Sequence, residues 1–327
     1  MVTGSVRIAT RGSELALWQA RAVEASIGRA APHVAVEIRV IRTTGDHVQD
    51  VPLARIGDKG LFTKELDAAL LAGEADLAVH SLKDVPTRVP EGLEIVSISH
   101  REDPRDVLVL PPGRTGTLAT LPAGARVGTS SLRRRAQLAA ARPELEVLDL
   151  RGNLNTRLAK LDRGDYDAIV LAAAGVLRLG WRERIAERLD PASWLPAVGQ
   201  GALAVVARAG DGRIRALLAA FHDPVTAACT AAERAFLAAL EGGCQIPIGA
   251  LATLDDEGLT LHGLVADVDG ETVLRDSVFL PVGGDGWLAS APSLGRALAG
   301  QLLAMGAGEI LARVRGESPR VPEPAAP

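Results

Sequence analysis

The sequence predicts an α/β fold made of two similar lobes, followed by a smaller α+β domain. Through the first two thirds of the chain, short apolar strands alternate with segments of helical periodicity. This alternation is typical of a mostly parallel sheet covered by helices. Beyond about residue 225 the pattern changes to a long helix, strands of alternating hydrophobicity and a last helix. The change of pattern predicts a separate domain of another architecture.

The first lobe begins with a short apolar strand and a helix for which Ser13 is a suitable N-cap. Residues 34–40 then alternate between apolar and polar side chains, which indicates a strand with one better buried face. A Gly-rich turn follows the second strand. In chain order the predicted elements are strand 6–10, helix 14–27, strand 34–40, helix 61–72 and strand 76–80.

A second α/β unit begins after the break at residues 101–104. Its expected strands are 107–110, 126–129, 147–150 and 168–171, with helices from residue 132 and over 155–163. The unit ends near Pro191 and Pro196. Ligands of such open sheets bind at the carboxyl ends of the strands, so we expect the site residues there.

The apolar strand 202–206 has no preceding partner of its own kind, and we expect it to return to the first sheet. Two crossings between the lobes would form a hinge, as in bilobal proteins that close around small molecules. The predicted domains are residues 1–100 with 200–220, residues 101–199, and residues 221–315. Residues 316–327 are rich in Pro and Glu and are expected to be a disordered tail.

Composition excludes several classes of function. The formal net charge is -4, which argues against a protein that coats nucleic acid or an anionic membrane. No apolar run reaches the roughly 18 residues that a bilayer span needs, and no leader is seen, so we expect a cytoplasmic protein. The chain has 2 cysteines, which excludes a disulfide scaffold and a multi-cysteine zinc site. No metal is expected.

Each cysteine needs its own explanation. Cys244 lies in Glu241–Gly249, where two glycines precede it between a predicted helix and a strand. A lone intracellular cysteine is more often a small buried apolar residue than a reactive thiol. The flanking glycines favour an accessible thiol at Cys244. Cys229 lies in an Ala-rich helical run, where the packing interpretation is preferred.

Lys83 and Asp84 follow directly after a predicted strand, in the segment His80–Pro86. A carboxylate at this place can exchange protons with an amine or stabilise a cation, and a lysine can hold a substrate carboxylate. The alternative is that Asp84 caps a helix and that Lys83 is solvated.

Arginines gather after two further strands, in Gly128–Arg135 and in Leu150–Arg157. Backbone N–H groups at a strand-to-helix turn attract anions, and guanidinium groups suit carboxylates. The alternative is a solvated charged helix face. Thr10–Ser13 is expected to form a similar anion-binding turn in the first lobe, assisted by Lys59. Because no nucleotide-binding glycine motif is present at the required place, nucleotide binding has no specific support.

Taken in order, these motifs resemble the porphobilinogen deaminase (hydroxymethylbilane synthase) family over nearly the whole chain. The segments that carry the resemblance are Arg11–Gln19, Lys59–Phe62, His80–Pro86, Gly128–Arg134, Leu150–Asn153, Leu195–Gly201 and Glu241–Cys244. The resemblance implies two lobes like those of periplasmic binding proteins, joined by a hinge, and a third domain that carries a cofactor cysteine. It implies a dipyrromethane cofactor held on Cys244 through a thioether.

The resemblance also implies roles for individual residues. Asp84 is expected to be the catalytic carboxylate. Expected to bind the cofactor with Cys244 and Asp84 are Lys83, Ser131, Arg133 and Arg134. Expected to bind substrate are Arg11, Ser13, Lys59, Phe62, Arg151, Arg157, Arg178 and Gln200. Phe62 is placed by the resemblance on a loop over the site, but its helical spacing from Leu66 fits a core residue equally well.

The implied activity is that of a monomeric transferase of tetrapyrrole, porphyrin and heme biosynthesis. It condenses four porphobilinogen molecules head to tail into hydroxymethylbilane and releases ammonia. No nucleic acid, membrane or obligate protein partner is expected. The alternative is a non-enzymatic bilobal protein that binds a small anion, which would give Cys244 no role.

Overall fold

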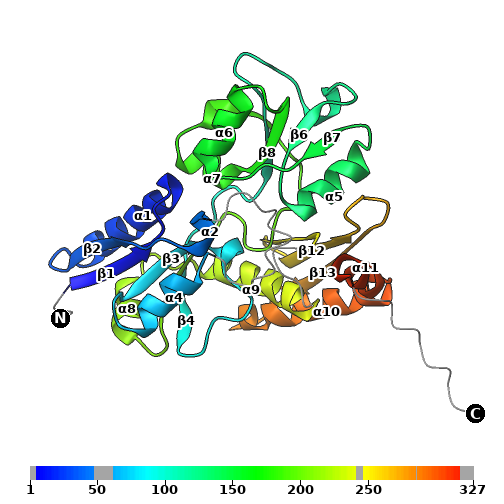
Figure 1. Ribbon diagram of the computed structural model, residues 1–327. Coiled ribbons are helices and arrows are strands. Elements are labelled where there is room, and N and C mark those ends of the chain that lie inside the picture. Colours follow the sequence, from blue (N-terminus) through cyan, green and yellow to red (C-terminus); the bar gives the residue numbers. More distant parts are fainter. Residues whose placement is uncertain (1–4, 48–61, 241–245, 285, 317–327) are drawn as a thin grey trace, which may run out of the picture.

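The structure is a computed structural model, and it describes residues 5–47, 62–240, 246–284 and 286–316. Three sheets organise it, two of five strands and one of three. Figure 1 shows the first sheet with β1 and β2 at one end of the molecule, the second sheet above it, and the third beside helices α10 and α11. The α/β fold class predicted from the sequence is confirmed.

The first sheet has the strand order β2-β1-β3-β10-β4. Its strands are β1 (Ser5–Thr10), β2 (Ala35–Val40), β3 (Leu77–Ser81), β4 (Leu93–Ile98) and β10 (Leu203–Arg208). The helices that accompany it are α1 (Glu14–Ala30), α2 (Thr44–His47), α4 (Lys64–Leu71) and α8 (Gly212–Leu217), with the 3-10 turn η1 (Leu82–Asp84). We call this sheet and its helices the first lobe.

Helix α1 illustrates how the sequence builds this lobe. The hydroxyl of Ser13 accepts a hydrogen bond from the Ala16 N–H, which caps the helix as the sequence predicted. Ala20, Val23 and Ile27 then recur at helical spacing, and all three are fully buried against the first sheet. The carboxyl end of β1 is thereby held next to a capped helix start.

The second sheet has the order β7-β6-β8-β5-β9. Its strands are β5 (Asp106–Val109), β6 (Arg126–Gly128), β7 (Glu146–Leu148), β8 (Ala168–Ala172) and β9 (Ile185–Arg188). Its helices are α5 (Leu132–Ala141), α6 (Leu154–Asp162) and α7 (Ala173–Arg178), with 3-10 turns η2 (Leu118–Thr120) and η3 (Arg182–Arg184). This sheet and its helices form the second lobe.

Both large sheets are mostly parallel, as expected, but in each of them one strand runs against the other four. In the first lobe β10 runs antiparallel to β3 and β4, and in the second lobe β5 runs antiparallel to β8 and β9. Each of these strands is the first one after the chain has crossed from the other lobe. A strand that enters from the opposite side runs against strands that are linked by helical crossovers.

The third sheet is an antiparallel meander of β11 (Ile248–Leu254), β12 (Gly258–Ala266) and β13 (Val273–Pro281). The helices beside it are α9 (Pro224–Ala239), α10 (Ala291–Ala304) and α11 (Ala307–Arg315), with the 3-10 turn η4 (Trp287–Ser290). Phe236 of α9 is fully buried in this core. A Cβ on Gly295 of α10 would lie 2.1 Å from the Ala232 carbonyl oxygen, so the close contact of α9 and α10 needs glycine there.

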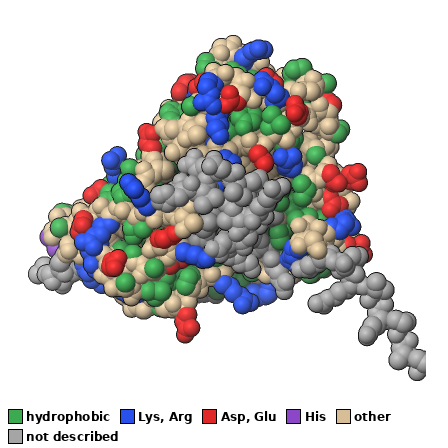
Figure 2. Space-filling model, in the orientation of Figure 1, with side chains coloured by type: hydrophobic (Ala, Val, Ile, Leu, Met, Phe, Trp, Pro, Cys, Tyr) green, Lys and Arg blue, Asp and Glu red, His purple; other side chains and the backbone are tan. Residues whose placement is uncertain are grey.

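None of the described helices combines the length and the apolar composition that a transmembrane span requires. The helical segments Trp287–Ala304 and Ala307–Arg315 have the length and apolar composition of a span only when they are taken together, and the chain bends by 85° between them. Figure 2 shows acidic and basic side chains interspersed over the face that it presents.

The predicted division into domains stays a prediction, and the predicted tail lies outside the described residues apart from Gly316.

Candidate active site

The segment with Lys83 and Asp84 follows β3 of the first sheet. Strand β3 is buried from Leu77 to His80, and the chain then forms η1, which the Val85 N–H closes by donating to the Leu82 carbonyl at 3.1 Å. The Leu82 side chain is buried beneath the turn. Lys83 and Asp84 are half-buried at the carboxyl end of the strand, where the sequence predicted ligand-binding residues.

A chain of hydrogen bonds connects this turn to the second sheet. Lys83 Nζ donates to Gln200 Oε1 at 3.1 Å, and Gln200 Nε2 donates to Asp106 Oδ1 at 2.9 Å. Gln200 is almost fully buried between the two lobes. Burial lowers the pKa of Lys83 to about 8, with the positive charges of Arg134 and Arg133 acting in the same direction. Lys83 therefore faces a strongly cationic region.

Arg133 and Arg134, the source of that charge, share one buried carboxylate. Arg133 Nη1 and Arg134 Nη2 each lie 2.7 Å from an oxygen of Asp106, at the start of β5. Trp194 Nε1 also donates to Asp106, at 2.9 Å. Burial alone would raise the pKa of Asp106, but the two guanidinium groups hold it well below its ordinary value. Two cations for one anion leave this cluster positive.

The turn that begins α5 fixes both arginines. The Ser131 hydroxyl is positioned to accept from the Arg134 N–H at 3.5 Å, and Arg134 Nη1 reaches the Val170 carbonyl of β8 at 3.0 Å. Arg133 Nη1 donates to the Leu195 carbonyl at 2.7 Å. Burial lowers the pKa of Arg133. These contacts hold each guanidinium in one place before any ligand binds.

Arg151 and Arg157 follow β7 and bring further positive charge. Asn153 caps α6 by accepting from the Thr156 N–H at 2.9 Å, and Arg157 Nε donates to the Gly152 carbonyl at 2.8 Å. Burial, together with the positive charges of Arg134 and Arg151, lowers the pKa of Arg157 to about 10, while the charge of Asp84 acts in the opposite direction. Residues from the ends of β3, β6 and β7 thus lie within electrostatic reach of one another.

The first strand-to-helix turn contributes Arg11 and Ser13. The Arg11 guanidinium lies over the ring of Phe62, 4.2 Å from its centroid, which is a cation–π contact. Burial and the charge of Arg11 lower the pKa of His80 at the end of β3 to about 4, so His80 is neutral. Ser13 is occupied as the cap of α1. Phe62 therefore contacts a predicted site residue.

Arg178 closes the group from α7. Its Nη2 donates to the Gly201 carbonyl at 2.7 Å, and its guanidinium lies 5.6 Å from the ring centroid of Trp18 on α1. Burial lowers the pKa of Arg178 to about 10. Near it, Asn155 Nδ2 donates to Glu14 Oε2 at 2.6 Å. The contact of Arg178 with Trp18 and the hydrogen bond from Asn155 to Glu14 both join the second lobe to the first.

Two predicted site residues, Lys59 and Cys244, lie outside the described residues. The other cysteine, Cys229, is buried in α9, and burial raises the pKa of its thiol to about 11. Very little thiolate forms at neutral pH at such a pKa. The packing interpretation of Cys229 agrees with this placement.

Sequence patterns alone missed Asp106. It stands at the head of an apolar strand, and an acidic residue there was the available signal.

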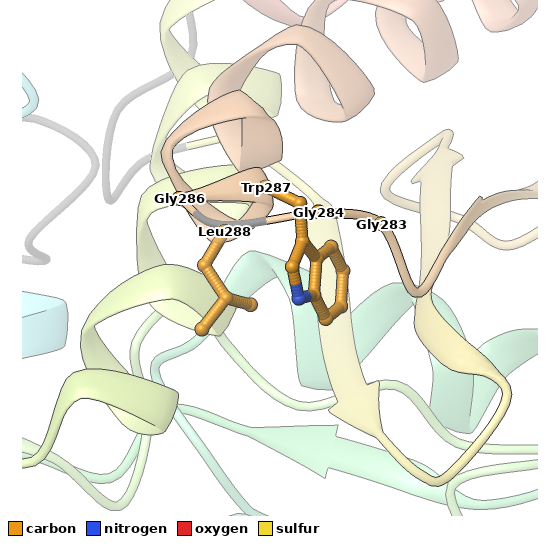
Figure 3. Close-up of a pocket in the computed structure, with 5 residues that line it drawn as sticks. All are labelled: Gly283, Gly284, Gly286, Trp287 and Leu288. Carbon is orange, nitrogen blue, oxygen red and sulfur yellow. The ribbon is translucent and has the colours of Figure 1, made fainter.

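The pocket in Figure 3, of about 320 Å³, is lined by Gly283, Gly284, Gly286, Trp287 and Leu288. None of these described lining residues is ionisable, so the candidate site is the cationic cluster between the lobes.

Comparison with known proteins identifies the family. A family profile described as "Porphobilinogen deaminase, dipyromethane cofactor binding domain" matches residues 6–216. The chain belongs to the porphobilinogen deaminase family. A second profile of porphobilinogen deaminase, its C-terminal domain, matches residues 227–304. The two profiles therefore cover both lobes and most of the third sheet with its helices.

Curated relatives agree over nearly the whole length of the chain. The porphobilinogen deaminase of Moorella thermoacetica is 56% identical over 313 residues, which are 96% of this chain and 97% of that protein. The porphobilinogen deaminase of Syntrophobacter fumaroxidans is 52% identical, over 94% of this chain and 97% of that protein. The resemblance seen in the sequence motifs is confirmed.

Among solved structures, the periplasmic VFT2 domain of Bordetella pertussis BvgS aligns with 65% of this chain and 85% of its own. The sequence identity is 19% and the TM-score is 0.40. A likeness of this size carries no argument about function.

Proposed function

We propose that this chain is a hydroxymethylbilane synthase, which condenses porphobilinogen stepwise and releases one ammonia per condensation. Membership of the porphobilinogen deaminase family supports the substrate class and the enzymatic activity. The observation that carries the proposal is a cationic cluster at the strand ends of both lobes: Lys83 stands beside Asp84 on the first lobe, and Arg133, Arg134 and Arg157 stand on the second.

The described residues fit a dipyrromethane cofactor, which carries several carboxylates. Arg133 and Arg134 have one carboxylate between them, and Arg134 Nε is a buried donor with no hydrogen-bond partner in the described part of the chain. A buried donor of this kind calls for a ligand. Burial also lowers the pKa of Lys83 and of Arg157, a penalty that a bound carboxylate relieves. When bound, dipyrromethane supplies the pyrrole carbon that is joined to substrate.

Asp84 is proposed as the catalytic carboxylate. Loss of ammonia from the aminomethyl group of porphobilinogen leaves a positive charge on the substrate pyrrole. A fixed carboxylate beside that ring stabilises the charge more than it stabilises the neutral ground state. Within the described residues Asp84 has no hydrogen bond or ion pair, which leaves its oxygens available to the ring N–H.

The arginines are proposed to hold acid groups. Each porphobilinogen brings an acetate and a propionate, and guanidinium groups bind carboxylates with two parallel hydrogen bonds. Arg133 and Arg134, with Lys83 and Ser131, are assigned to the cofactor. Assigned to the substrate are Arg11, Ser13, Lys59, Phe62, Arg151, Arg157, Arg178 and Gln200.

Cys244 is proposed as the attachment point of the cofactor, through a thioether. The other cysteine of the chain, Cys229, is buried with a thiol pKa of about 11, which suits a packing residue rather than a nucleophile. A transferase mechanism with no metal follows from this chemistry, and a monomer is the expected state.

The intact mass of the purified protein tests the proposal directly. We expect an excess of one dipyrrole over the sequence mass, which peptide mapping places on Cys244. Cys244→Ser should lose both the excess mass and ammonia release, while the matched variant Cys229→Ser keeps both. An excess on Cys229, or an unmodified active protein, would refute the attachment at Cys244. Wild-type protein that releases no ammonia from porphobilinogen would refute the enzyme.

A further inference from the structure

Arg234 of α9 binds three consecutive backbone carbonyls of the first lobe. Its Nη1 donates to the Val85 carbonyl at 3.0 Å, and its Nη2 donates to those of Pro86 at 2.6 Å and Thr87 at 3.2 Å. The side chain is half-buried, and burial lowers its pKa to about 10. It has no ion pair within the described residues. Its hydrogen bonds therefore go to this one stretch of backbone.

The stretch follows Asp84 directly. On the other side of Asp84, the Leu82 N–H donates to the Ala202 carbonyl at 3.0 Å, and the Leu82 side chain is buried. Pro86 has no N–H, so the chain there cannot continue a sheet ladder. Arg234 supplies the donors that a neighbouring strand would otherwise provide. The turn is thus anchored to the first sheet before Asp84 and to α9 after it.

Helix α9 is itself firmly placed. Glu233, beside Arg234, is fully buried and accepts from Arg101 Nη1 at 2.6 Å, from the Gly199 N–H at 2.7 Å and from the Ala252 N–H at 2.8 Å. These partners belong to both crossings between the lobes and to the third sheet. A guanidinium on such a helix is a rigid support.

We propose that Arg234 is a positioning residue that fixes the Asp84 carboxylate from the helix leading to the segment of Cys244. The inference rests on the proposed function, since it assigns the reacting carboxylate to Asp84. It goes beyond that function because it gives α9 two tasks: the helix carries Arg234, which positions the Asp84 carboxylate, and it leads into the segment that contains Cys244. Arg234 acts through the backbone and does not contact the substrate.

The first test is kinetic. Arg234→Lys keeps the charge but cannot reach three carbonyls, so kcat per cofactor-bearing molecule should fall about 10- to 100-fold while KM stays within about twofold, as for a displaced catalytic group. Arg208→Lys is the matched control. Arg208, at the end of the inner strand β10, also donates to two carbonyls, those of Leu70 and Ala75, both at 2.8 Å, and it lies beside the start of β3 instead of its end. An unchanged kcat in Arg234→Lys, or an equal loss in Arg208→Lys, would overturn the inference.

A double-mutant cycle asks whether Arg234 acts through Asp84. In an Asp84→Asn background, adding Arg234→Lys should change the residual rate by less than about twofold, because the effect it transmits is already lost. If the full loss seen in the wild-type background persists, Arg234 does not act through Asp84.

Hydrogen exchange gives a readout that needs no activity. The peptide that spans residues 82–89 should exchange faster in Arg234→Lys than in wild type, and at the wild-type rate in Arg208→Lys. Equal exchange in all three proteins would overturn the anchoring even if the enzyme is active. A wild type that releases no ammonia, together with faster exchange in Arg234→Lys, would refute the proposed function and the catalytic part of the inference while retaining the anchor.

Discussion

One carboxylate determines the charge of the arginine cluster. Asp106 accepts from Arg133, Arg134, Trp194 and Gln200, and it is completely buried. One buried carboxylate paired with two guanidinium groups leaves a net positive charge, and solvent screens a buried charge poorly. The cluster is therefore prepared to take up an acidic ligand, and its preorganisation reduces the entropy that binding would otherwise lose.

Lys83 makes the uptake of that ligand depend on pH. Its pKa of about 8 means that the ammonium is charged below that pH and neutral above it. We expect the rate at which apoprotein gains the cofactor mass from porphobilinogen to fall above about pH 8 relative to Lys83→Arg, since arginine stays charged. Intact mass spectrometry over a pH series measures both rates. A ratio of the two rates that does not change with pH would contradict a role for the Lys83 charge.

The two segments that cross between the lobes form the next level of organisation. They pair with each other: the Ser99 N–H donates to the Leu203 carbonyl at 3.0 Å, and the Glu102 N–H donates to the Gly201 carbonyl at 3.1 Å. Arg101 Nε adds a bond to the Gln200 carbonyl at 3.0 Å. Two paired strands bend together more readily than they slide apart. The sequence-based expectation of a hinge with two crossings agrees with this pairing.

Gly201 tests the fit of these segments. Its φ is +95°, and a Cβ there would lie 2.3 Å from the Glu102 carbonyl oxygen. Gly201→Ala should therefore lower the free energy of unfolding by about 3 kcal/mol, through strain and displacement of that carbonyl. Gly210→Ala is the control, with φ +77° and open space around the added carbon, and should cost about 1 kcal/mol. Urea unfolding measures both, and equal losses would show that the contact with Glu102 is unimportant.

Local patterns predicted most helices and strands but not that β5 and β10 run against the other strands of their sheets. The N-cap residue Ser13 marked a helix start correctly, because a cap is a local interaction. Strands β4 and β9 were missed. Both lie at sheet edges, where one side of the strand is unpaired, and β9 carries a mixed pattern of half-buried residues. Direction depends on where the chain enters a sheet, which composition does not record.

The same reasoning explains which site residues could be predicted. Lys83, Asp84 and the arginines lie in contiguous motifs at strand ends, and the structure brings them together. Asp106 and Arg234 act on segments far away in the sequence, and their own neighbours give no sign of it. Asp106 has partners 27 to 94 residues away, and Arg234 has partners 147 to 149 residues away, which local sequence patterns do not reveal.

At the scale of the whole molecule, Glu233 joins the third sheet to both lobe crossings. Its carboxylate is fully buried and faces Arg101, whose side chain is 12% exposed. Glu233→Gln leaves that guanidinium without its anion and should lower the free energy of unfolding by about 3–5 kcal/mol. Glu94→Gln, which breaks a more exposed pair with Arg215, should lower the free energy of unfolding much less, because solvent screens that pair. Denaturant unfolding followed by circular dichroism compares them, and similar losses would deny Glu233 its central place.

The position of β10 has a consequence for how the protein is made. It lies between β3 and β4, yet it is translated only after all five strands of the second sheet. Long-range pairings of this kind form late, because the intervening chain must first be made and closed into a loop. On the ribosome the second lobe can become compact while the first still lacks an inner strand. The part of the molecule that starts the chain is thus not the part that is finished first.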